Sequence, residues 1–354
     1  MHPLSHPGTG TSGPGGPGDA DGTPVATGLC VRIAGWTVAV ETADADLRDL
    51  LRRMFFRFVV PAVPSREAVA RLEVVAPDAP RPAPEVRVLP RVQRVVEGTL
   101  RIEGEDYSAT LSADGLRATV VGLGRFPVET VLKVMLATEL ARRGGLLVHG
   151  VAVAHQGRAA LFVGHSGAGK STLGALWAGA GGVLLSDELV AVWPEAEAPG
   201  SVVDLASAGG ASGFMAGAGE DSDSRGASGS VEGAGEDSGA REASGSMSGA
   251  VHDRVWRASG TPWNVGLPVE ATLHAVGTLA WDSGSRWEAQ AAGTVGRMLM
   301  LNALLPEASV AGRGGLLAAA GRLLSEVPPV RLVFARDASA AQVVRRALEV
   351  AEHG

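Results

Sequence analysis

Residues 161–172, LFVGHSGAGKST, decide the fold. An apolar run leads into Gly164, and after four further residues come Gly169, Lys170 and Ser171. This spacing is typical of a phosphate-binding loop that joins a strand to a helix. Glycines leave room for backbone N–H groups to approach phosphate oxygens, and the N-terminus of the following helix adds partial positive charge. A glycine-rich turn that matches by chance is the alternative, and the apolar run and the helix on either side argue against it.

The loop residues divide into a phosphate cradle and two side chains with more specific tasks. We expect Lys170 to reach the β- and γ-phosphates of a nucleotide, and Ser171 to offer its hydroxyl to Mg²⁺. The expected cradle consists of Gly164, His165, Ser166, Gly167, Ala168, Gly169, Lys170, Ser171 and Thr172.

Residues 183–188, VLLSDE, predict a buried strand that ends in two carboxylates. An acidic residue at such a strand end contacts Mg²⁺ directly or through water in phosphate-loop proteins. Asp187 and Glu188 are therefore predicted to complete the site, with a solvated turn as the alternative.

Strands and helices alternate through the C-terminal region, which predicts an α/β domain over residues 126–354. Residues 127–143 predict a helix that Gly144-Gly145 ends, and the helix after the loop is expected to reach about residue 177. Strands are expected at 146–154, 159–164, 276–281 and 330–334, and helices at 294–305, 315–325 and 339–352.

A small α+β region is predicted before this domain, over residues 28–125. Alternating side chains predict a strand at 31–41, and helical spacing of apolar residues predicts a helix at 44–58. Shorter strands, mostly antiparallel, are expected at 70–75, 86–95, 100–102, 107–112 and 116–121. Asp114-Gly115 predicts a hairpin turn between the last two strands. No catalytic constellation stands out in this region.

Two segments contain too few large apolar residues to offset the entropy of ordering. The first is a predicted disordered tail at residues 1–27. The second is a predicted disordered insertion at about 195–250, rich in Gly, Ala, Ser and acidic residues. It repeats with a period of 16 residues, so that GAGEDS occurs at 217–222 and again at 233–238. We expect the insertion to be deletable without loss of the fold.

Composition excludes several classes of function. The net charge of −7 gives no basic footprint for nucleic acid. No run of about 18 apolar residues and no secretory signal is present, so no membrane partner is expected. Cys30 is the single cysteine, which excludes an internal disulfide framework and fits a reducing cytoplasm. We therefore expect a cytoplasmic protein.

The phosphate loop, the strand before it and the acidic pair after it together resemble the HPr kinase/phosphorylase family, including the HPr kinase-like proteins of modified-peptide biosynthetic clusters. The family combines a His-Gly pair on a strand, a short hairpin, a G-x-S-G-x-G-K-S loop and an apolar strand ending in paired acids. Here these are His149-Gly150, residues 164–172 and Asp187-Glu188. The resemblance covers residues 146–192 well and the remaining C-terminal part loosely. It implies a fold related to phosphoenolpyruvate carboxykinase and transfer of the ATP γ-phosphoryl group to a serine hydroxyl.

The resemblance also implies roles for single residues. Asp187 would take the proton of the serine, Glu188 would face Mg²⁺ where the family has a second Asp, and His149 would orient or charge-tune Asp187. The family's basic segment for phosphorolysis is not recognisable, so we expect a kinase rather than a phosphorylase. Residues 260–263, GTPW, look like a motif of the peptide-cluster proteins. They predict either a loop that closes on nucleotide or acceptor, or a rigid turn around a buried tryptophan. Arg257 is a candidate for stabilising phosphate charge.

The leading hypothesis is an Mg²⁺- and ATP-dependent kinase that acts on a serine of a small protein or peptide. The alternatives are a nucleotide-binding regulatory or scaffold protein without transfer activity, and a small-molecule kinase. A transport or mechanical ATPase ranks lower, because no Leu-Ser-Gly-Gly-Gln-like signature is present. The sequence does not specify the acceptor, the adenine pocket or the oligomeric state, and it leaves a homo-oligomer open.

Overall fold

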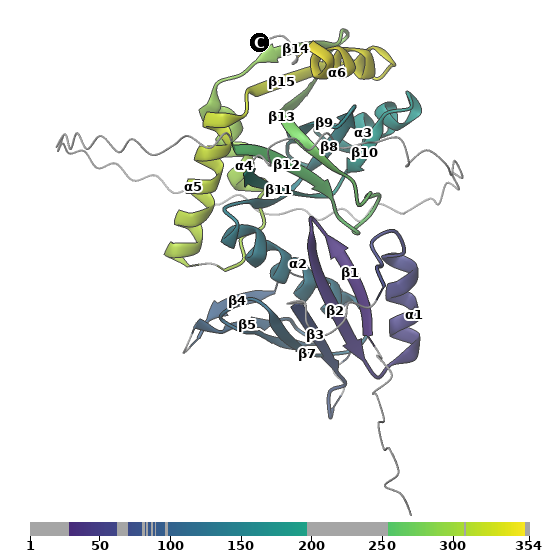
Figure 1. The fold of residues 1–354 in the computed structure, drawn as a ribbon, viewed down its shortest axis with the longest axis vertical. Helices are drawn as coiled ribbons and strands as arrows, with labels where there is room; N and C mark the ends of the chain where they lie inside the picture. Colours follow the sequence, from purple (N-terminus) through teal and green to yellow (C-terminus); the bar gives the residue numbers. More distant parts are fainter. Residues whose placement is uncertain are drawn as a thin grey trace, which may run out of the picture.

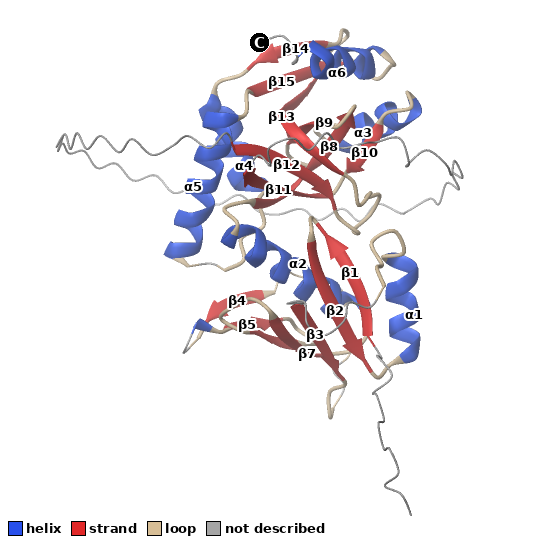
Figure 2. Cartoon of the chain, viewed as in Figure 1, coloured by secondary structure: helices blue, strands red, loops and turns tan. Residues whose placement is uncertain are grey.

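The computed structural model describes residues 28–61, 70–79, 90–95, 98–196, 254–307 and 309–350, together with residues 82, 84, 85 and 88. The predicted tail and nearly all of the predicted insertion lie outside the described residues. The described part is a mixed α/β structure with two β-sheets and six helices (Figure 1, Figure 2). Within it, no helix is long and apolar enough to cross a membrane.

The first sheet has seven strands in the order β1-β2-β3-β7-β6-β5-β4. They are β1 (Gly28–Ile33), β2 (Trp36–Thr42), β3 (Ala70–Val75), β4 (Arg91–Arg94), β5 (Leu100–Glu103), β6 (Ser108–Leu111) and β7 (Arg117–Val121). Buried and more exposed side chains alternate along most of these strands, so one face of the sheet is buried. Antiparallel pairs are the majority, as predicted. However, β2, β3 and β7 run parallel at the centre of the sheet, and α1 (Ala45–Met54) is the crossover that connects β2 to β3.

Two turns organise the hairpins of this sheet. The single strand predicted at 31–41 is instead the hairpin β1–β2. Its turn residues Ala34 and Gly35 have φ angles of 51° and 71°, which are typical of a two-residue hairpin turn. The predicted Asp114-Gly115 turn between β6 and β7 is confirmed, with φ of 72° at Gly115 and a hydrogen bond of 2.9 Å from Leu116 N to Asp114 Oδ1.

Helix α1 is shorter than the sequence predicts. Asp44 caps its first turn, because the Asp44 carboxylate accepts a hydrogen bond of 3.0 Å from Leu47 N. The helix ends at Met54 rather than at 58. Phe55 and Phe58 lie in the turn that follows and are buried in the core, so their apolar character serves tertiary packing and not a longer helix.

Helix α2 (Arg125–Arg142) lies between the two sheets (Figure 1). The prediction at 127–143 is confirmed to within two residues at each end, and Gly144 follows the helix with φ of 75°. Apolar side chains on all sides of α2 are buried: Pro127, Val128, Val131, Leu132, Val134, Met135, Leu136, Ala137 and Leu140. The same core cluster contains side chains of the first sheet and also Leu147, Leu189 and Trp263 from the second part of the chain. The two regions on either side of residue 125 therefore share one hydrophobic core.

The second sheet has eight strands, and part of it closes on itself. They are β8 (Leu146–His155), β9 (Arg158–Val163), β10 (Val183–Ser186), β11 (Leu189–Ala196), β12 (Arg254–Gly260), β13 (Glu270–Trp281), β14 (Arg286–Ala289) and β15 (Pro329–Phe334). β8 pairs with β9 and β11, β11 with β12, β12 with β13, and β13 with β9, so the pairing returns to β8. β10, β15 and β14 extend the sheet beyond this ring.

Helices cover both faces of the second sheet. α3 (Lys170–Gly179) and α6 (Ser339–Val350) pack on one face in one core cluster, whereas α4 (Ala292–Asn302) and α5 (Val310–Glu326) pack on the other in a second cluster. β9, β13 and β15 are parallel, so their carboxyl ends lie at the same edge of the sheet. The phosphate-loop motif begins at this edge.

Candidate functional site

The loop between β9 and α3 has the strand–loop–helix geometry that its sequence predicts. β9 ends at Val163 and α3 begins at Lys170. Gly167 and Gly169 have φ angles of 80° and 102°, a region that L side chains rarely adopt. No side chain caps α3. The first N–H groups of the helix have no acceptor inside it, so they remain available to an anion.

Aromatic side chains from the neighbouring strands support one side of the loop. A Cβ atom at Gly169 would lie 2.6 Å from Trp281 Cζ2 and 2.8 Å from Phe334 Cζ. Trp281 Nε1 donates a hydrogen bond of 3.3 Å to Gly167 O, and the guanidinium of Arg336 lies 4.5 Å from the centroid of the Trp281 ring. At Gly167 a Cβ atom would meet nothing within 4 Å. The loop is thus packed on one side and open on another, as a ligand cradle requires.

The Lys170 side chain lies within the curve of the loop. Its Nζ donates hydrogen bonds of 2.8 Å to Gly164 O and 3.2 Å to His165 O. The residue is only 8% exposed, and burial lowers the pKa of its ammonium group. The side chains beside it differ in exposure, because Ser171 is exposed and Thr172 half-buried.

Asp187 lies in the turn between β10 and β11, beside α3. A register shift at Leu185 in β10 precedes this turn, and such bulges redirect the residues that follow them. A Cβ atom at Gly174, one helical turn after Ser171, would lie 3.6 Å from the Cβ of Asp187. Asp187 Oδ1 accepts a hydrogen bond of 2.8 Å from Asn264 Nδ2. Burial raises the pKa of the Asp187 carboxyl, and the charge of Glu188 raises it further, although hydrogen bonds act in the opposite direction.

Glu188 faces a different partner, which the sequence-based prediction did not include. Its Oε1 lies 3.5 Å from Lys133 Nζ, and Lys133 is on α2. The same Nζ lies 5.3 Å from the centroid of the Trp263 ring, within the range of a cation–π contact. The two acidic residues therefore point to different neighbours, Asp187 to α3 and Asn264, and Glu188 to α2.

His149 lies on the strand between β9, which leads into the loop, and β11, which follows the acidic pair. It lies in β8 directly opposite Leu189, and Gly150 N donates a hydrogen bond of 2.9 Å to Glu188 O. Burial lowers the pKa of the His149 imidazole, the positive charge of Lys170 lowers it further, and the charge of Glu188 opposes this. Burial and the charge of Lys170 therefore both favour the neutral form of the imidazole. The resemblance implied that His149 orients or charge-tunes Asp187. In the structure, Glu188 is the acidic residue whose charge acts on the imidazole.

The Gly-Thr-Pro-Trp turn packs against the acidic pair as a rigid element. Thr261 Oγ1 donates a hydrogen bond of 2.7 Å to Leu189 O, and a Cβ atom at Gly260 would overlap the backbone oxygens of Leu185 and Leu267. Trp263 is 3% exposed, and its indole N–H has no hydrogen-bond acceptor among the described residues. These contacts fit the rigid-turn interpretation, and the turn also positions Asn264.

Arg257 does not lie at the phosphate loop. It is on β12, where its Nε is 2.7 Å from Glu195 Oε2 and its Nη1 donates a hydrogen bond of 3.0 Å to Thr272 Oγ1. The interpretation of Arg257 as a residue that stabilises phosphate charge is therefore wrong. Its guanidinium instead contacts side chains of the two neighbouring strands, Glu195 of β11 and Thr272 of β13.

The donor set suits Mg²⁺ held together with a nucleotide better than a metal held by protein alone. In the described part of the chain, no three His, Cys, Asp or Glu side chains gather as a metal site. Mg²⁺ commonly binds one or two carboxylates plus substrate phosphates and water. The Ser171 hydroxyl and one carboxylate of the Asp187-Glu188 turn provide such a partial set, so the residues present fit the ion.

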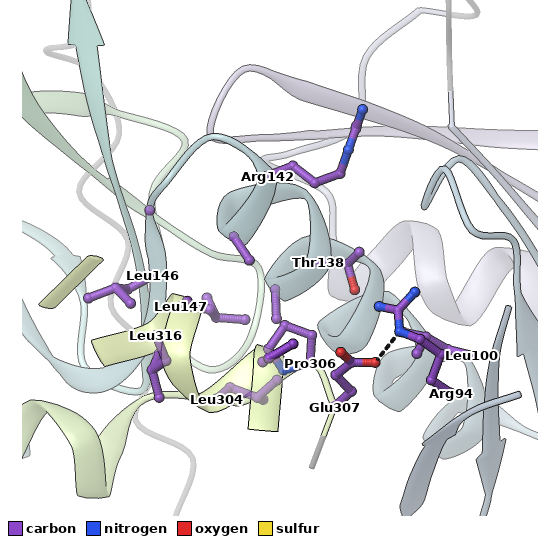
Figure 3. A pocket seen from close by; sticks show the side chains of 16 residues that line it. Arg94, Leu100, Thr138, Arg142, Leu146, Leu147, Leu304, Pro306, Glu307 and Leu316 are labelled. Atoms are coloured by element: carbon purple, nitrogen blue, oxygen red, sulfur yellow. Dashed lines mark hydrogen bonds and ion pairs between the residues drawn. The ribbon is translucent and has the colours of Figure 1, made fainter. Parts of the chain in front are cut away.

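A cavity of about 280 Å³ lies elsewhere, between α2, α5 and the first sheet (Figure 3). Its walls are mostly apolar, and an ion pair of 2.7 Å between Arg94 Nε and Glu307 Oε2 lies at one end. None of its lining residues belongs to the phosphate loop or to the Asp187-Glu188 turn. The cavity is therefore separate from the candidate site.

No protein-family model matches the chain, and a search of the curated proteins finds no match.

Proposed function

We propose that the protein is an ATP-dependent kinase with a core related to HPr kinase/phosphorylase and phosphoenolpyruvate carboxykinase. It transfers the γ-phosphoryl group to a serine hydroxyl of a small protein or peptide. One observation carries the proposal: the left-handed glycines of the loop lie beside Lys170, while the chain brings Asp187, Glu188 and His149 to the same edge. Nucleotide binding needs the loop alone, whereas transfer to a hydroxyl also needs a base and a metal-facing carboxylate.

Binding and charge neutralisation account for most of the chemistry in this proposal. The loop N–H groups and Lys170 hold the phosphates, and Ser171 with Glu188 would hold Mg²⁺. When bound, Mg²⁺–ATP supplies the phosphoryl group and offsets its negative charge. The Trp281 and Phe334 side chains pack closely at Gly169 and support this conformation of the loop, so the backbone donors would need little rearrangement to bind phosphate.

Asp187 is the proposed base. Its raised pKa makes the carboxylate more basic than an ordinary Asp, and the hydrogen bond from Asn264 fixes its direction. In the transfer, the serine oxygen forms a bond to the γ-phosphorus while the bond from that phosphorus to the bridging oxygen breaks. ADP leaves and Asp187 takes the hydroxyl proton. His149 lies on the strand next to β11, and its imidazole, when neutral, can donate one hydrogen bond and accept another at this edge of the sheet.

Substitution of Lys170 and Asp187 tests the proposal. Peptide libraries, small proteins and a set of small molecules that carry hydroxyl groups are incubated with ATP and Mg²⁺, and products are identified by mass spectrometry. We expect a phosphoserine product with the unaltered protein. Lys170→Met should weaken ATP binding by about tenfold or more, because a charge-assisted contact to phosphate is lost. Asp187→Asn should bind ATP normally but transfer about a hundredfold more slowly, because the base is lost.

The alternatives give different results in the same experiment. ATP binding without any phosphorylated product would instead favour a nucleotide-binding regulatory protein. Phosphorylation of small molecules but of no peptide or protein would favour a small-molecule kinase. Arg142→Ala is a suitable control, since this exposed cation on α2 pairs with Glu139 within the helix at 3.0 Å. It should leave both binding and transfer unchanged.

A further inference from the structure

The chain uses lysine at only two positions. Of its 31 Lys and Arg residues, Lys133 and Lys170 are the lysines and all the others are arginines. The phosphate-loop pattern explains Lys170. Lys133 belongs to no motif, yet the fold brings it from α2 to the same site. The lysine that the loop does not explain is therefore found beside the proposed metal-facing carboxylate.

The contacts of Lys133 are specific. Its Nζ lies 3.5 Å from Glu188 Oε1 and 5.3 Å from the centroid of the Trp263 ring, and its side chain is 25% exposed. Glu129, one turn earlier on α2, lies 3.8 Å from Arg125 instead. The buried indole restricts the direction from which the ammonium approaches Glu188, because Trp263 itself is held by a rigid turn. Among the described residues, Glu188 is thus the ion-pair partner of Lys133 within 4 Å, and the Trp263 ring lies on another side of the ammonium. The charge of Lys133 also acts on Glu129.

We propose that Lys133 is a positioning residue for Glu188. Its ammonium holds one carboxylate oxygen and leaves the second oxygen free to face Mg²⁺. This inference rests on the proposed kinase function. It extends that function by assigning the orientation of the metal-facing carboxylate to a residue of α2.

The chemical difference between lysine and arginine explains why position 133 carries a lysine although nearly all other cationic positions of the chain carry an arginine. A guanidinium presents a planar fork that binds both oxygens of a carboxylate at once. At position 133 such a fork would occupy both oxygens of Glu188 and remove them from the metal. An ammonium is a compact point charge and engages a single oxygen. Arginine serves equally well where a cation only needs to be solvated or to close an ion pair.

Lys133→Arg and Lys133→Ala test the inference, with Arg142→Ala as a matched loss of one α2 cation. Mn²⁺ affinity is measured by electron paramagnetic resonance in the presence of ADP, and the Mg²⁺ concentration for half-maximal transfer is measured separately. We expect both Lys133 variants to weaken Mn²⁺ binding by about tenfold, as is usual when a partner of a metal ligand is removed. Arg142→Ala should not change it. ADP affinity in metal-free buffer should be the same in all variants.

The outcomes distinguish a failure of the positioning role of Lys133 from a failure of the proposed kinase function. A Lys133→Arg protein with the Mn²⁺ affinity of the unaltered chain would overturn the positioning role. Failure of the unaltered protein to bind ADP both with and without Mg²⁺ would instead overturn the kinase proposal itself. Thermal unfolding of each variant checks that the fold is intact. Lys133→Met, which keeps the length of the side chain, replaces Lys133→Ala if that variant is unfolded and is held to the same expectation.

Discussion

His274 illustrates how burial alone can make a single residue sensitive to pH. Burial, and to a lesser degree the charge of Arg158, lowers the pKa of the His274 imidazole. The unfolded chain binds a proton at this residue near pH 6.5, whereas the folded chain binds it only at lower pH. Acid therefore favours the unfolded state. The stability that is present above about pH 6.5 is lost as the pH falls toward the folded pKa.

We expect His274→Gln to reduce this loss of stability. The melting temperature of the variant should fall less than that of the unaltered protein between about pH 7.5 and about pH 5.5, because a proton-binding difference has been removed. Thermal unfolding followed by circular dichroism at several pH values measures the effect. Parallel curves for the two proteins would show that His274 is protonated equally in the folded and unfolded states.

Single residues of the site differ in how far the sequence could predict them. The place of Lys170 and Ser171 at the start of a helix after a strand and a glycine loop was predictable, because the phosphate-loop pattern has a fixed spacing along the chain. Asn264 and Lys133 come from other elements and reach the acidic pair only through tertiary packing, so no local pattern marks them. The scarcity of lysine was nevertheless visible in the sequence and could have singled out Lys133.

At the scale of elements, the turn after β12 depends on close approach of backbone. A Cβ atom at Gly260 would overlap Leu185 O and Leu267 O, and backbone atoms cannot move aside easily. Gly260→Ala should therefore lower the free energy of unfolding by about 2 kcal/mol. Urea unfolding measures this change, and phosphoryl transfer should slow as well, because the turn holds Asn264 against Asp187.

A second glycine provides the control for this prediction. Gly321 lies inside α5, and a Cβ atom there would meet nothing within 4 Å. Gly321→Ala should raise the free energy of unfolding by up to about 1 kcal/mol, since alanine favours the helix. Equal effects of the two substitutions would show that the close approach at Gly260 does not matter.

The elements that the sequence predicted poorly are those defined by long-range contacts. β14 has only four residues and exists as a strand because it pairs with β15 at the edge of the sheet. The parallel centre of the first sheet likewise follows from a crossover, which no periodicity reveals. By contrast, α2 and β9 were predictable, because a long apolar helix and a short apolar run before a glycine loop carry strong local signals.

At the scale of the whole molecule, the chain returns from the insertion at nearly the point where it left. Ala196 at the end of β11 pairs with Arg254 at the start of β12. Replacement of residues 197–253 by a short glycine-containing turn should therefore leave an ordinary hairpin. We expect a melting temperature equal to or above that of the full chain, because a shorter loop costs less entropy to close. ATP affinity measured by calorimetry should be unchanged, and its loss would assign these residues a part in the site.

The predicted division of the chain at residue 125 does not divide its core. α2 packs against the first sheet and also against side chains of β8 and β11, all in a single cluster. A sequence boundary could be placed there because the pattern of elements changes from short strands to alternating strands and helices. The shared core could not be foreseen, because it depends on which faces of the two sheets meet α2.

The position of Lys133 on α2 has a consequence for genetics. The helix is rigid, and its neighbouring turns are anchored by the core of the first sheet. We expect a substitution in that core, at Leu72 or Val120 for example, to displace α2 and with it the Lys133 ammonium that lies beside Glu188. A selection for inactive yet folded variants should therefore recover changes far upstream of the phosphate loop, in residues that touch neither nucleotide nor acceptor.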